Sequence, residues 1–438
     1  MLFTVSPGGV LNGELRVPGD KSISHRAIML GSIADGETEV EGFLQGEDSL
    51  ATLQAFQKMG VRIETGDGDK LLVHGVGLHG LCMPDSDLDL GNSGTSMRLL
   101  TGLMAGQSFA SRLIGDESLN NRPMNRVAFP LRDMGATIDT ADDGRPPLQV
   151  TGSGVLQGIE YTLPVASAQI KSSLLLAGLY SEGQTSIIEP APTRDHTERM
   201  LRSLGYEVNT EPLSEGVSRI SLQGGGALQA AKLRVPADIS SAAFFMVAAS
   251  IVPGSELLLR DVGVNPTRTG IVHILREMGA DIRFVNERMW GTEPVADIRV
   301  CHAQLRGIEI DERCVPLAID EFPVIFIAAL AASGETVLRG ARELRVKESD
   351  RIAVMAEGIA TLGGAAKATE DGMILRSSQL NGGRVNSYGD HRIAMAFAVA
   401  GLQASGPVDI DNCYNVATSF PGFAQLSANA GMDITAQT

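Results

Sequence analysis

The sequence predicts an α/β protein that is built from six copies of one unit, and three observations support this class. Helical stretches rich in small residues alternate with short β-branched stretches, and a glycine separates the two. A second helical stretch follows in each unit and ends beside another glycine. These terminal glycines recur every 68 to 84 residues, so that six units account for all 438 residues.

Each unit begins with a helix, a glycine break and a strand. In LGSIADGETEVEGF, residues 30–43, small and apolar residues give way at Gly36 to a stretch with β-branched Thr and Val. The same pattern recurs in residues 175–190, 247–262 and 329–341. Polar residues that differ from copy to copy precede the first helix of each unit, which is typical of a rigid scaffold that carries function on its loops.

The second helix of each unit is expected to end at its glycine, because glycine accepts left-handed geometry without a side-chain clash. Four copies are clear, in residues 56–64, 131–139, 201–209 and 275–283, and two are weaker, in 359–367 and 427–435. The terminal glycines are Gly60, Gly135, Gly205, Gly279, Gly363 and Gly431. Each unit is therefore roughly βαβα with one or two further strands. The repeat alone leaves open a solenoid, a ring or two domains of three units.

Composition narrows the function. Hydrophobic residues at 43% and charged residues at 20% are ordinary values for a globular protein. A net charge of -16 argues against binding to nucleic acid or to an anionic membrane surface. No apolar stretch is long enough to span a bilayer, and the first residues do not resemble a signal peptide. We expect a cytoplasmic protein.

Cysteine and histidine give no sign of a metal or a disulfide. Cys82, Cys301, Cys314 and Cys413 stand apart without a CxxC pair, which favours free thiols in a reducing compartment. The seven histidines show no HxxxH or HExxH spacing. We expect neither a metal nor a cofactor.

Cations collect near the starts of the helices. In VPGDKSISHR, Lys21 and Arg26 add positive charge where amide dipoles already favour an anion. Arginine binds carboxylates and phosphates through two parallel hydrogen bonds, and lysine acts as a mobile point charge. If these cations converge, the ligand carries several negative charges. The set comprises Lys21, Arg26, Arg98, Arg122, Arg194, Lys347, Arg351 and Arg392.

Two carboxylates lie among these cations in the sequence, Asp320 in AIDEFPV and Glu348 in RVKESDR. Each is a candidate base. A carboxylate before an apolar run also serves as an ordinary helix cap, and this structural role is equally compatible with the pattern at Asp320. A base among arginines needs a closed, partly dry site, because the cations otherwise stabilise its charged form.

Seven segments resemble one family, in the same order along the chain. They are VPGDKSISHRA, GNSGTSMRLLTG, SAQIKSSLLLAGL, RDHTERML, DEFPV, RVKESDRI and GDHRIAMAF. Together they resemble the 5-enolpyruvylshikimate-3-phosphate (EPSP) synthases, which are enolpyruvyltransferases, from about residue 10 to about residue 425. KSISHR, SAQ and RDHTE are more similar to the second bacterial class of that family.

The resemblance implies a fold. Such proteins have two similar domains, each of three repeats, with buried parallel helices and outward-facing sheets in an inside-out barrel. The chain crosses between the domains twice, and RVPGDKS and RVPADIS are the matching segments here. We therefore expect one domain at 1–19 and 236–438, the other at 20–235, and an active-site cleft between them.

The resemblance also implies a reaction. The enolpyruvyl group of phosphoenolpyruvate passes to the 5-hydroxyl of shikimate 3-phosphate, and phosphate is released, in the pathway to chorismate and the aromatic amino acids. Protonation of the phosphoenolpyruvate methylene makes C2 electrophilic, the hydroxyl attacks, and a tetrahedral adduct collapses. The partners are these two small molecules, and we expect a monomer.

Site residues carry over position by position from the same resemblance. Lys21 would touch both substrates and move protons, Asp320 would accept the 5-hydroxyl proton and Glu348 would handle the methyl proton. Shikimate 3-phosphate would be bound by Lys21, Ser22, Arg26, Ser167, Ala168, Gln169, Arg194, Asp320 and Lys347. Phosphoenolpyruvate would be bound by Lys21, Gly94, Arg122, Gln169, Arg351 and Arg392.

The sequence departs from the family pattern at two positions. Thr418 stands in ATSFP where the enteric enzymes have a lysine, and Leu99 stands where a proline often follows the arginine of the GTxMR loop. At Gly94 the main chain can approach a ligand closely, because glycine has no Cβ. We expect alanine there to crowd glyphosate, which targets this family, more than phosphoenolpyruvate.

Two other functions compete with this assignment. The sister enolpyruvyltransferase that acts on UDP-N-acetylglucosamine has a loop cysteine near the stretch occupied here by GDESLNNRPM, and no cysteine occurs between Cys82 and Cys301. A noncatalytic anion-binding scaffold would not need Lys21, Asp320 and Glu348 together.

Overall fold

The computed structural model of the protein describes residues 1–152 and 154–437. The chain forms two compact units. Unit 1 consists of Met1–Pro18, Pro236–Met289 and Pro294–Thr438, and unit 2 consists of Gly19–Val235 and Trp290–Glu293. Each unit has its own apolar core. The chain therefore passes from one unit to the other four times, because the short segment Trp290–Glu293 belongs with unit 2.

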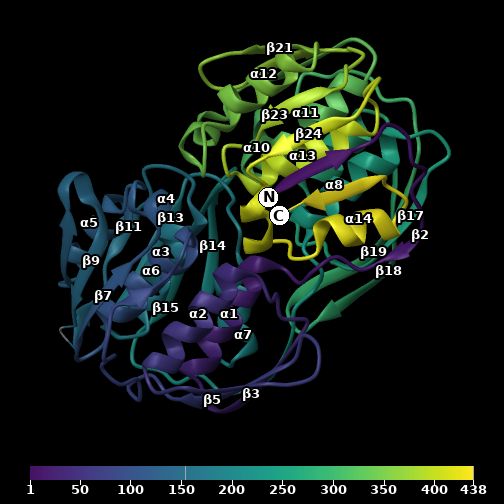
Figure 1. The fold of residues 1–438 in the computed structure, drawn as a ribbon. Coiled ribbons are helices and arrows are strands. Elements are labelled where there is room, and N and C mark those ends of the chain that lie inside the picture. The colour runs from purple at the N-terminus through teal and green to yellow at the C-terminus, as the bar shows by residue number, and fades with distance from the viewer. Residues whose placement is uncertain (153, 438) are drawn as a thin grey trace. The chain divides into compact units, whose positions relative to one another are not determined.

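Unit 2 contains three four-stranded sheets within its described residues (Figure 1). In sheet order the first is β16(Lys232–Arg234), β3(Asp35–Glu41), β5(Leu71–Val76) and β4(Arg62–Thr65). The second is β6(Leu88–Asp89), β7(Ala110–Ile114), β9(Arg145–Thr151) and β8(Thr137–Ala141). The third is β11(Glu160–Thr162), β13(Gln184–Glu189), β15(Val217–Gln223) and β14(Asn209–Ser214), and β10(Leu156–Gln157) pairs with β12(Ser181–Glu182).

The sheets of unit 1 repeat this plan. The first is β18(Asp281–Trp290), β19(Glu293–Cys301), β17(Glu256–Gly263) and β2(Asn12–Leu15). The second is β20(Glu335–Leu338), β22(Met373–Arg376) and β21(Ala365–Ala368). The third is β23(Gly383–Asn386), β24(Val408–Asp411), β1(Leu2–Val5) and β25(Ile434–Gln437).

The six sheets follow one plan of strand pairing, which the three-stranded sheet keeps only in part, and this identifies them as copies. In unit 2 each sheet starts with a parallel pair, followed by two antiparallel pairs, as in β16–β3, β3–β5 and β5–β4. The sheet of β23, β24, β1 and β25 in unit 1 has the same order. The three-stranded sheet has only an isolated parallel bridge, Glu309 to Val337, in place of its first strand. The predicted α/β class, with three repeats in each of two domains, is confirmed.

The first helix of each repeat is buried, which explains its small and apolar composition. In unit 2 these helices are α1(Lys21–Ser32), α3(Gly94–Ala105) and α6(Ala168–Gly178), and in unit 1 they are α8(Ile239–Ile251), α11(Phe322–Ala331) and α13(His391–Gly401). Glycine brings two of them together, because a Cβ at Gly102 on α3 would lie 2.1 Å from the carbonyl oxygen of Ser173 on α6. All residues of α8 are buried, so this helix has no polar face.

The second helices end as predicted. They are α2(Glu47–Lys58), α5(Asn125–Asp133) and α7(His196–Ser203) in unit 2, and α9(Gly270–Glu277), α12(Arg351–Thr361) and α14(Phe423–Asn429) in unit 1; the shorter helices are α4(Glu117–Asn120) and α10(Val315–Ala318). Each of the six predicted glycines lies two residues beyond its helix and has a positive φ, between 78° and 112°. An L side chain rarely adopts this geometry.

Side-chain caps fix where most of the buried helices begin. Asp20, Ser93, Ser167, Asp238 and Asp390 each accept a hydrogen bond from a main-chain N–H of the helix that follows. Such a cap stabilises a helix by about 1 kcal/mol. The other main-chain N–H groups of the first turn make no hydrogen bond within the helix and point away from its start. These helix starts are therefore suited to binding anions.

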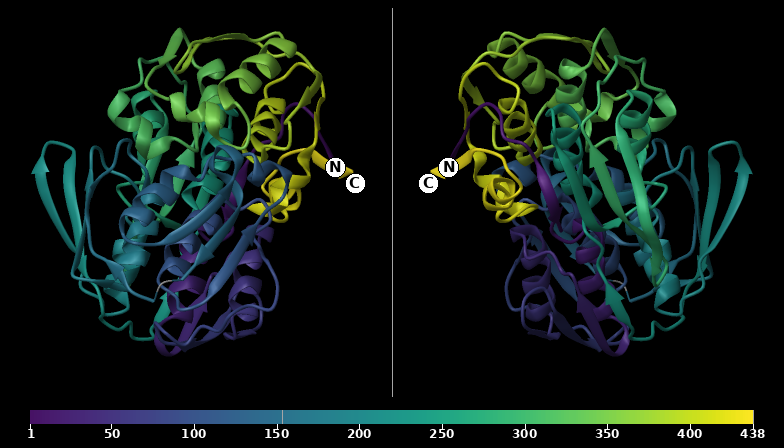
Figure 2. Two further views of the ribbon diagram at one scale, coloured as in Figure 1. Left: turned by 90° about the vertical axis from the view of Figure 1, so that its left-hand side faces the viewer. Right: turned by 90° about the vertical axis from the view of Figure 1, so that its right-hand side faces the viewer.

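The two ends of the chain are neighbours in unit 1. Strand β1 pairs with β25, with Leu2 opposite Gln437, and with β24 on its other side. Both views in Figure 2 accordingly show the N and C labels side by side. Within the described residues no helix is long and apolar enough to cross a membrane.

Candidate active site

In unit 2, the start of α1 positions Lys21. Asp20 caps the helix by accepting from the Ile23 N–H at 2.9 Å. The Lys21 ammonium forms an ion pair with the carboxylate of Asp48, in the first turn of α2. Asp48 is buried, with 4% of its side chain exposed, and Lys21 remains 20% exposed. A buried carboxylate therefore fixes the ammonium at the surface of the unit.

The start of α3 carries a second cationic group. A Cβ at Gly94 would lie 3.0 Å from Arg98 Nη1 and 3.1 Å from Arg122 Nη1, so two guanidinium groups flank this glycine. Arg122 also donates to the Asn92 side-chain oxygen at 2.6 Å. Two guanidinium groups beside the open amides of a helix start form a suitable site for a phosphate or carboxylate.

Gln169 links this group to α6. Its side-chain oxygen accepts from Arg98 Nη1 at 2.7 Å, and its amide donates to the Thr95 hydroxyl at 3.1 Å. Ser167 caps α6 through the Ile170 N–H, and Ala168 is the first residue of that helix. Ser167, Ala168 and Gln169 therefore occupy one helix start, and Gln169 touches the group around Gly94.

Arg26 is a buried member of the predicted binding set. Its side chain is buried, and it donates from Nε to the Thr197 hydroxyl at 2.7 Å and from Nη2 to the Ser172 hydroxyl at 2.8 Å. Burial lowers the pKa of the Arg26 guanidinium to about 10, although Glu198 and Asp20 oppose the shift. Arg26 thus remains a cation at neutral pH and ties α1 to α6 and α7. Ser22 contributes its carbonyl to Arg26 Nη1 at 2.8 Å, and Arg194 is near enough for its charge to lower the same pKa.

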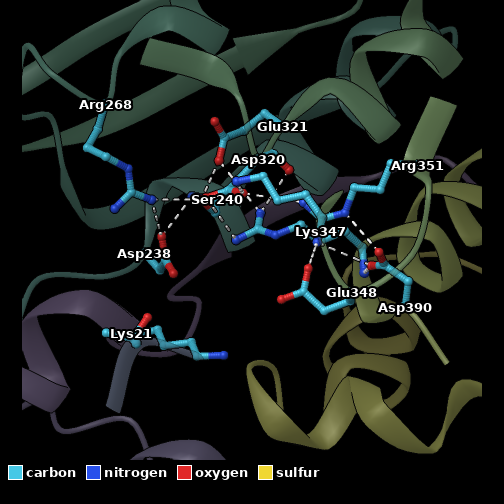
Figure 3. Close-up of polar contacts among 12 residues, drawn as sticks. Lys21, Asp238, Ser240, Arg268, Asp320, Glu321, Lys347, Glu348, Arg351 and Asp390 are labelled. Carbon is cyan, nitrogen blue, oxygen red and sulfur yellow. Dashed lines mark hydrogen bonds and ion pairs between the residues drawn. The ribbon is translucent and has the colours of Figure 1, made fainter. Parts of the chain in front are cut away.

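In unit 1, Arg351 joins the candidate acids. Its side chain is only 1% exposed, and it donates to Asp390 at 2.8 Å, to Glu348 at 2.6 Å and to Asp320 at 3.3 Å (Figure 3). Burial alone would lower the pKa of this guanidinium, but the carboxylates of Asp390, Glu348 and Asp320 outweigh it and raise that pKa above its ordinary value. Asp320 and Glu348 therefore share one permanent cation.

Asp320 lies close to three cationic side chains of unit 1. Lys347 Nζ lies 3.4 Å and Arg351 Nη1 lies 3.3 Å from the same oxygen, Oδ1. Arg392 Nη1 donates to the Asp320 carbonyl at 3.0 Å, and its Nη2 lies 4.0 Å from Oδ2. The structure thus brings together five predicted residues of unit 1, which are Asp320, Lys347, Glu348, Arg351 and Arg392.

Sequence patterns did not reveal the residues that hold the cations in place. Asp48 pairs with Lys21, Asp390 pairs with Arg351, and Asn92 orients Arg122. Asp48 and Asp390 resemble ordinary first-turn and capping carboxylates in the sequence, and Asp390 does cap α13. Asp390 could have been found as a carboxylate inside GDHRIAMAF, a segment already assigned to ligand binding, whereas Asp48 lies outside the seven segments.

The residues at the two positions that depart from the family pattern carry no charge. Thr418 is buried and donates from its hydroxyl to the Asn415 carbonyl at 2.7 Å, and Leu99 is fully buried. Neither supplies charge. In the part of the chain that the structure describes, no group of three or more His, Cys, Asp or Glu side chains could hold a metal ion.

Comparisons with known proteins identify the family of this chain. The sequence model of the family described as EPSP synthase (3-phosphoshikimate 1-carboxyvinyltransferase) matches residues 5–426. A 3-phosphoshikimate 1-carboxyvinyltransferase from Methylococcus capsulatus is 60% identical, over 99% of this chain and 98% of its own length. The corresponding protein from Alkalilimnicola ehrlichii is 61% identical, over 99% of this chain and 97% of its own.

The solved structures lead to the same result. An EPSP synthase structure from Acinetobacter baumannii superposes with a TM-score of 0.89 at 54% identity, over 99% of this chain and 100% of that chain. The resemblance drawn from the seven sequence segments is thereby confirmed, and this chain belongs to the EPSP synthase family.

Proposed function

We propose that this protein is a 3-phosphoshikimate 1-carboxyvinyltransferase of the shikimate pathway. It transfers the enolpyruvyl group of phosphoenolpyruvate to the 5-hydroxyl of shikimate 3-phosphate and releases phosphate. The observation that carries the proposal is the pair of carboxylates, Asp320 and Glu348, that share the buried guanidinium of Arg351. An anion-binding scaffold has no use for two acids among its cations, whereas addition and elimination require proton transfer in both directions.

The addition step forms a tetrahedral intermediate. A proton is added to the methylene carbon of phosphoenolpyruvate, which makes C2 electrophilic, and the 5-hydroxyl oxygen attacks C2. Asp320 accepts the hydroxyl proton in this scheme. Lys347 and Arg351 lie beside Asp320 Oδ1 and balance its negative charge, so the two anionic substrates can bind beside it.

The elimination step reverses the proton transfer at carbon. Glu348 removes a proton from the new methyl group, the C=C bond forms again and the C2–O bond to phosphate breaks. Lys21 contacts both substrates and supplies or accepts protons. Its ion pair with buried Asp48 supports this role, because the pair holds the ammonium in one place.

The proposed binding sets follow the clusters. Phosphoenolpyruvate is bound by Lys21, Gly94, Arg122, Gln169, Arg351 and Arg392. Shikimate 3-phosphate is bound by Lys21, Ser22, Arg26, Ser167, Ala168, Gln169, Arg194, Asp320 and Lys347. The guanidinium groups that flank Gly94 support the first set. The second set is supported by the capped start of α6, whose amides favour a phosphate.

Both sets draw on residues of both units, so we further propose that the substrates bind between a domain of residues 1–19 with 236–438 and a domain of residues 20–235. The protein acts in this proposal as a cytoplasmic monomer. Its four free cysteines support a reducing compartment.

Phosphate release from phosphoenolpyruvate tests the proposal. We expect release with shikimate 3-phosphate as acceptor, together with an enolpyruvyl product of the expected mass. Release with UDP-N-acetylglucosamine instead would identify the sister enzyme. Binding of shikimate 3-phosphate without any release would leave the anion-binding scaffold as the function.

A further inference from the structure

Glu321 is a buried carboxylate beside the candidate base that the proposed function does not use. It follows Asp320 directly and precedes the first residue of α11. Its side chain has no exposed surface. One carboxylate oxygen, Oε1, accepts a hydrogen bond from the Ser240 hydroxyl (Figure 3). The same oxygen lies 3.6 Å from Arg392 Nη1.

Arg392 is held between two groups at the start of α11. The same Nη1 atom that lies near Glu321 donates to the Asp320 carbonyl at 3.0 Å. The other terminal nitrogen, Nη2, lies 4.0 Å from Asp320 Oδ2. The Glu321 carboxylate thus competes with the Asp320 carboxylate for the Arg392 charge, and it draws the guanidinium toward the helix start.

Glu321 is itself anchored by a chain of buried polar groups. The Ser240 hydroxyl that donates to Glu321 also accepts from Arg268 Nη2 at 2.7 Å. Arg268 Nη2 in turn lies 3.1 Å from Asp238 Oδ1, which accepts from the Ser240 N–H at 2.8 Å. Ser240, Arg268 and Asp238 are all at least nine-tenths buried.

Asp238, at the far end of this hydrogen-bonded network, lies close to a point where the polypeptide passes from one unit to the other. Asp238 comes three residues after Val235, the last residue of the long unit-2 segment. Its N–H donates to the carbonyl of Pro18, the residue at which the first segment of unit 1 ends, at 2.9 Å. Two of the four crossing points, at residues 18–19 and 235–236, are therefore linked to Glu321 through Asp238, Arg268 and Ser240.

We propose that Glu321 is a positioning residue that orients Arg392 toward substrate and keeps it off the Asp320 carboxylate. The inference rests on the proposed function, in which Arg392 binds phosphoenolpyruvate and Asp320 accepts a proton. Without the Glu321 charge, Arg392 turns to the nearest remaining carboxylate, which belongs to Asp320. One cation is then lost from the phosphoenolpyruvate site.

The test compares Glu321→Gln with a matched control. Glutamine keeps the size of Glu321 and its acceptor for Ser240 but removes the charge. The control is Asp297→Asn, which neutralises another buried carboxylate of unit 1, held by Arg260 and Asn286 on the sheet of β17, β18 and β19. We expect Glu321→Gln to raise KM for phosphoenolpyruvate about tenfold and KM for shikimate 3-phosphate less than about twofold. Asp297→Asn should change neither KM.

A double-mutant cycle with Arg392→Lys shows whether the effect passes through Arg392. We expect the double variant to have the KM of Arg392→Lys alone. Independent, multiplicative effects would overturn the inference, as would an unchanged KM in Glu321→Gln or an equal rise for both substrates. If Arg392→Lys itself leaves KM for phosphoenolpyruvate unchanged, the proposed role of Arg392 fails instead.

Two further variants distinguish a specific effect on KM for phosphoenolpyruvate from a general loss of folded protein. Glu321→Asp keeps the charge and should restore part of the affinity for phosphoenolpyruvate. Ser240→Ala removes the hydroxyl that links Glu321 to Arg268 and should raise the same KM by a smaller factor. If Ser240→Ala lowers the thermal stability but leaves KM for phosphoenolpyruvate unchanged, the network of Ser240, Arg268 and Asp238 has a purely structural role.

Discussion

At Gly94, the absence of a side chain lets two guanidinium groups approach the main chain. We predict that Gly94→Ala raises KM for phosphoenolpyruvate about fivefold, the equivalent of about 1 kcal/mol, because the new Cβ meets Arg98 and Arg122 at 3.0 and 3.1 Å. The inhibition constant of glyphosate should rise more than this KM. Steady-state kinetics with both ligands measures the two effects, and an equal loss of affinity for both would contradict the prediction.

His25 gives the stability of unit 2 a pH dependence. The imidazole is buried on α1, with Nδ1 2.8 Å from the Thr52 hydroxyl. Burial, and then the charges of Lys21 and Arg26, hold the pKa of His25 well below 6.5. The unfolded chain therefore takes up a proton below about pH 6.5 that the folded chain refuses, and this contribution to stability is lost as the pH falls.

The pH dependence attributed to His25 is tested by comparing the melting temperatures of the wild type and His25→Gln. Between pH 7.5 and pH 5.5 we expect the melting temperature of the wild type to fall more than that of His25→Gln. The slope is at most about 1.4 kcal/mol per pH unit for one proton. Thermal unfolding followed by circular dichroism at the two pH values measures it. Parallel falls would mean that His25 does not carry the dependence.

Individual ion pairs were only partly predictable from the sequence. Glu348 and Arg351 lie only three residues apart, in the loop before α12 and at its first residue, so their pairing is local. Asp320 and Asp390 reach the same guanidinium from two other buried helices, and no local pattern indicates that. The residue types needed for anion chemistry were therefore visible, whereas the partners of each cation depend on packing between distant segments.

At the scale of elements, the glycine after each second helix was the most reliable signal. Gly135, after α5, has a φ of 95°, and a Cβ there would meet no atom within 4 Å. We predict that Gly135→Ala destabilises the protein by about 1 kcal/mol through backbone strain alone. This corresponds to a fall of about 2–4 °C in the melting temperature of a unit of this size.

Gly135→Asn is the control for that prediction, because asparagine tolerates left-handed geometry better than alanine. Calorimetry should place its melting temperature between those of Gly135→Ala and the wild type. If both variants melt with the wild type, backbone geometry at this helix end does not limit stability.

No sequence pattern indicates the contacts made by the tip of one hairpin. The tip of the hairpin between β18 and β19, Trp290–Glu293, belongs to unit 2, although both strands lie in a sheet of unit 1. Buried His196 Nδ1 donates to Glu293 Oε1 at 2.8 Å, and Arg199 donates to the Thr292 carbonyl at 2.6 Å. These contacts join residues about a hundred positions apart, and nothing in either segment indicates the other.

At the scale of the whole molecule, the proposed function requires one ligand to engage both units. We predict that shikimate 3-phosphate, at about a hundred times its Kd, slows amide exchange by up to about a hundredfold in segments whose opening releases the ligand. Slowing should occur at the start of α6 in unit 2 and around Lys347 in unit 1. Hydrogen exchange with mass spectrometry measures both, and inorganic phosphate is the control. Slowing confined to one unit would contradict a site shared by both.

The pairing of β1 with β24 and β25 has a consequence for synthesis on the ribosome. Residues 2–5 are made long before either of their partner strands, which are β24(Val408–Asp411) and β25(Ile434–Gln437). At about 5–20 residues per second, translation leaves this strand without partners for roughly 20 to 80 seconds. Unit 2, whose long segment ends at Val235, can complete most of its core during that time. Translation therefore favours a fixed order, in which the inserted unit folds first and the unit that contains both chain ends closes last.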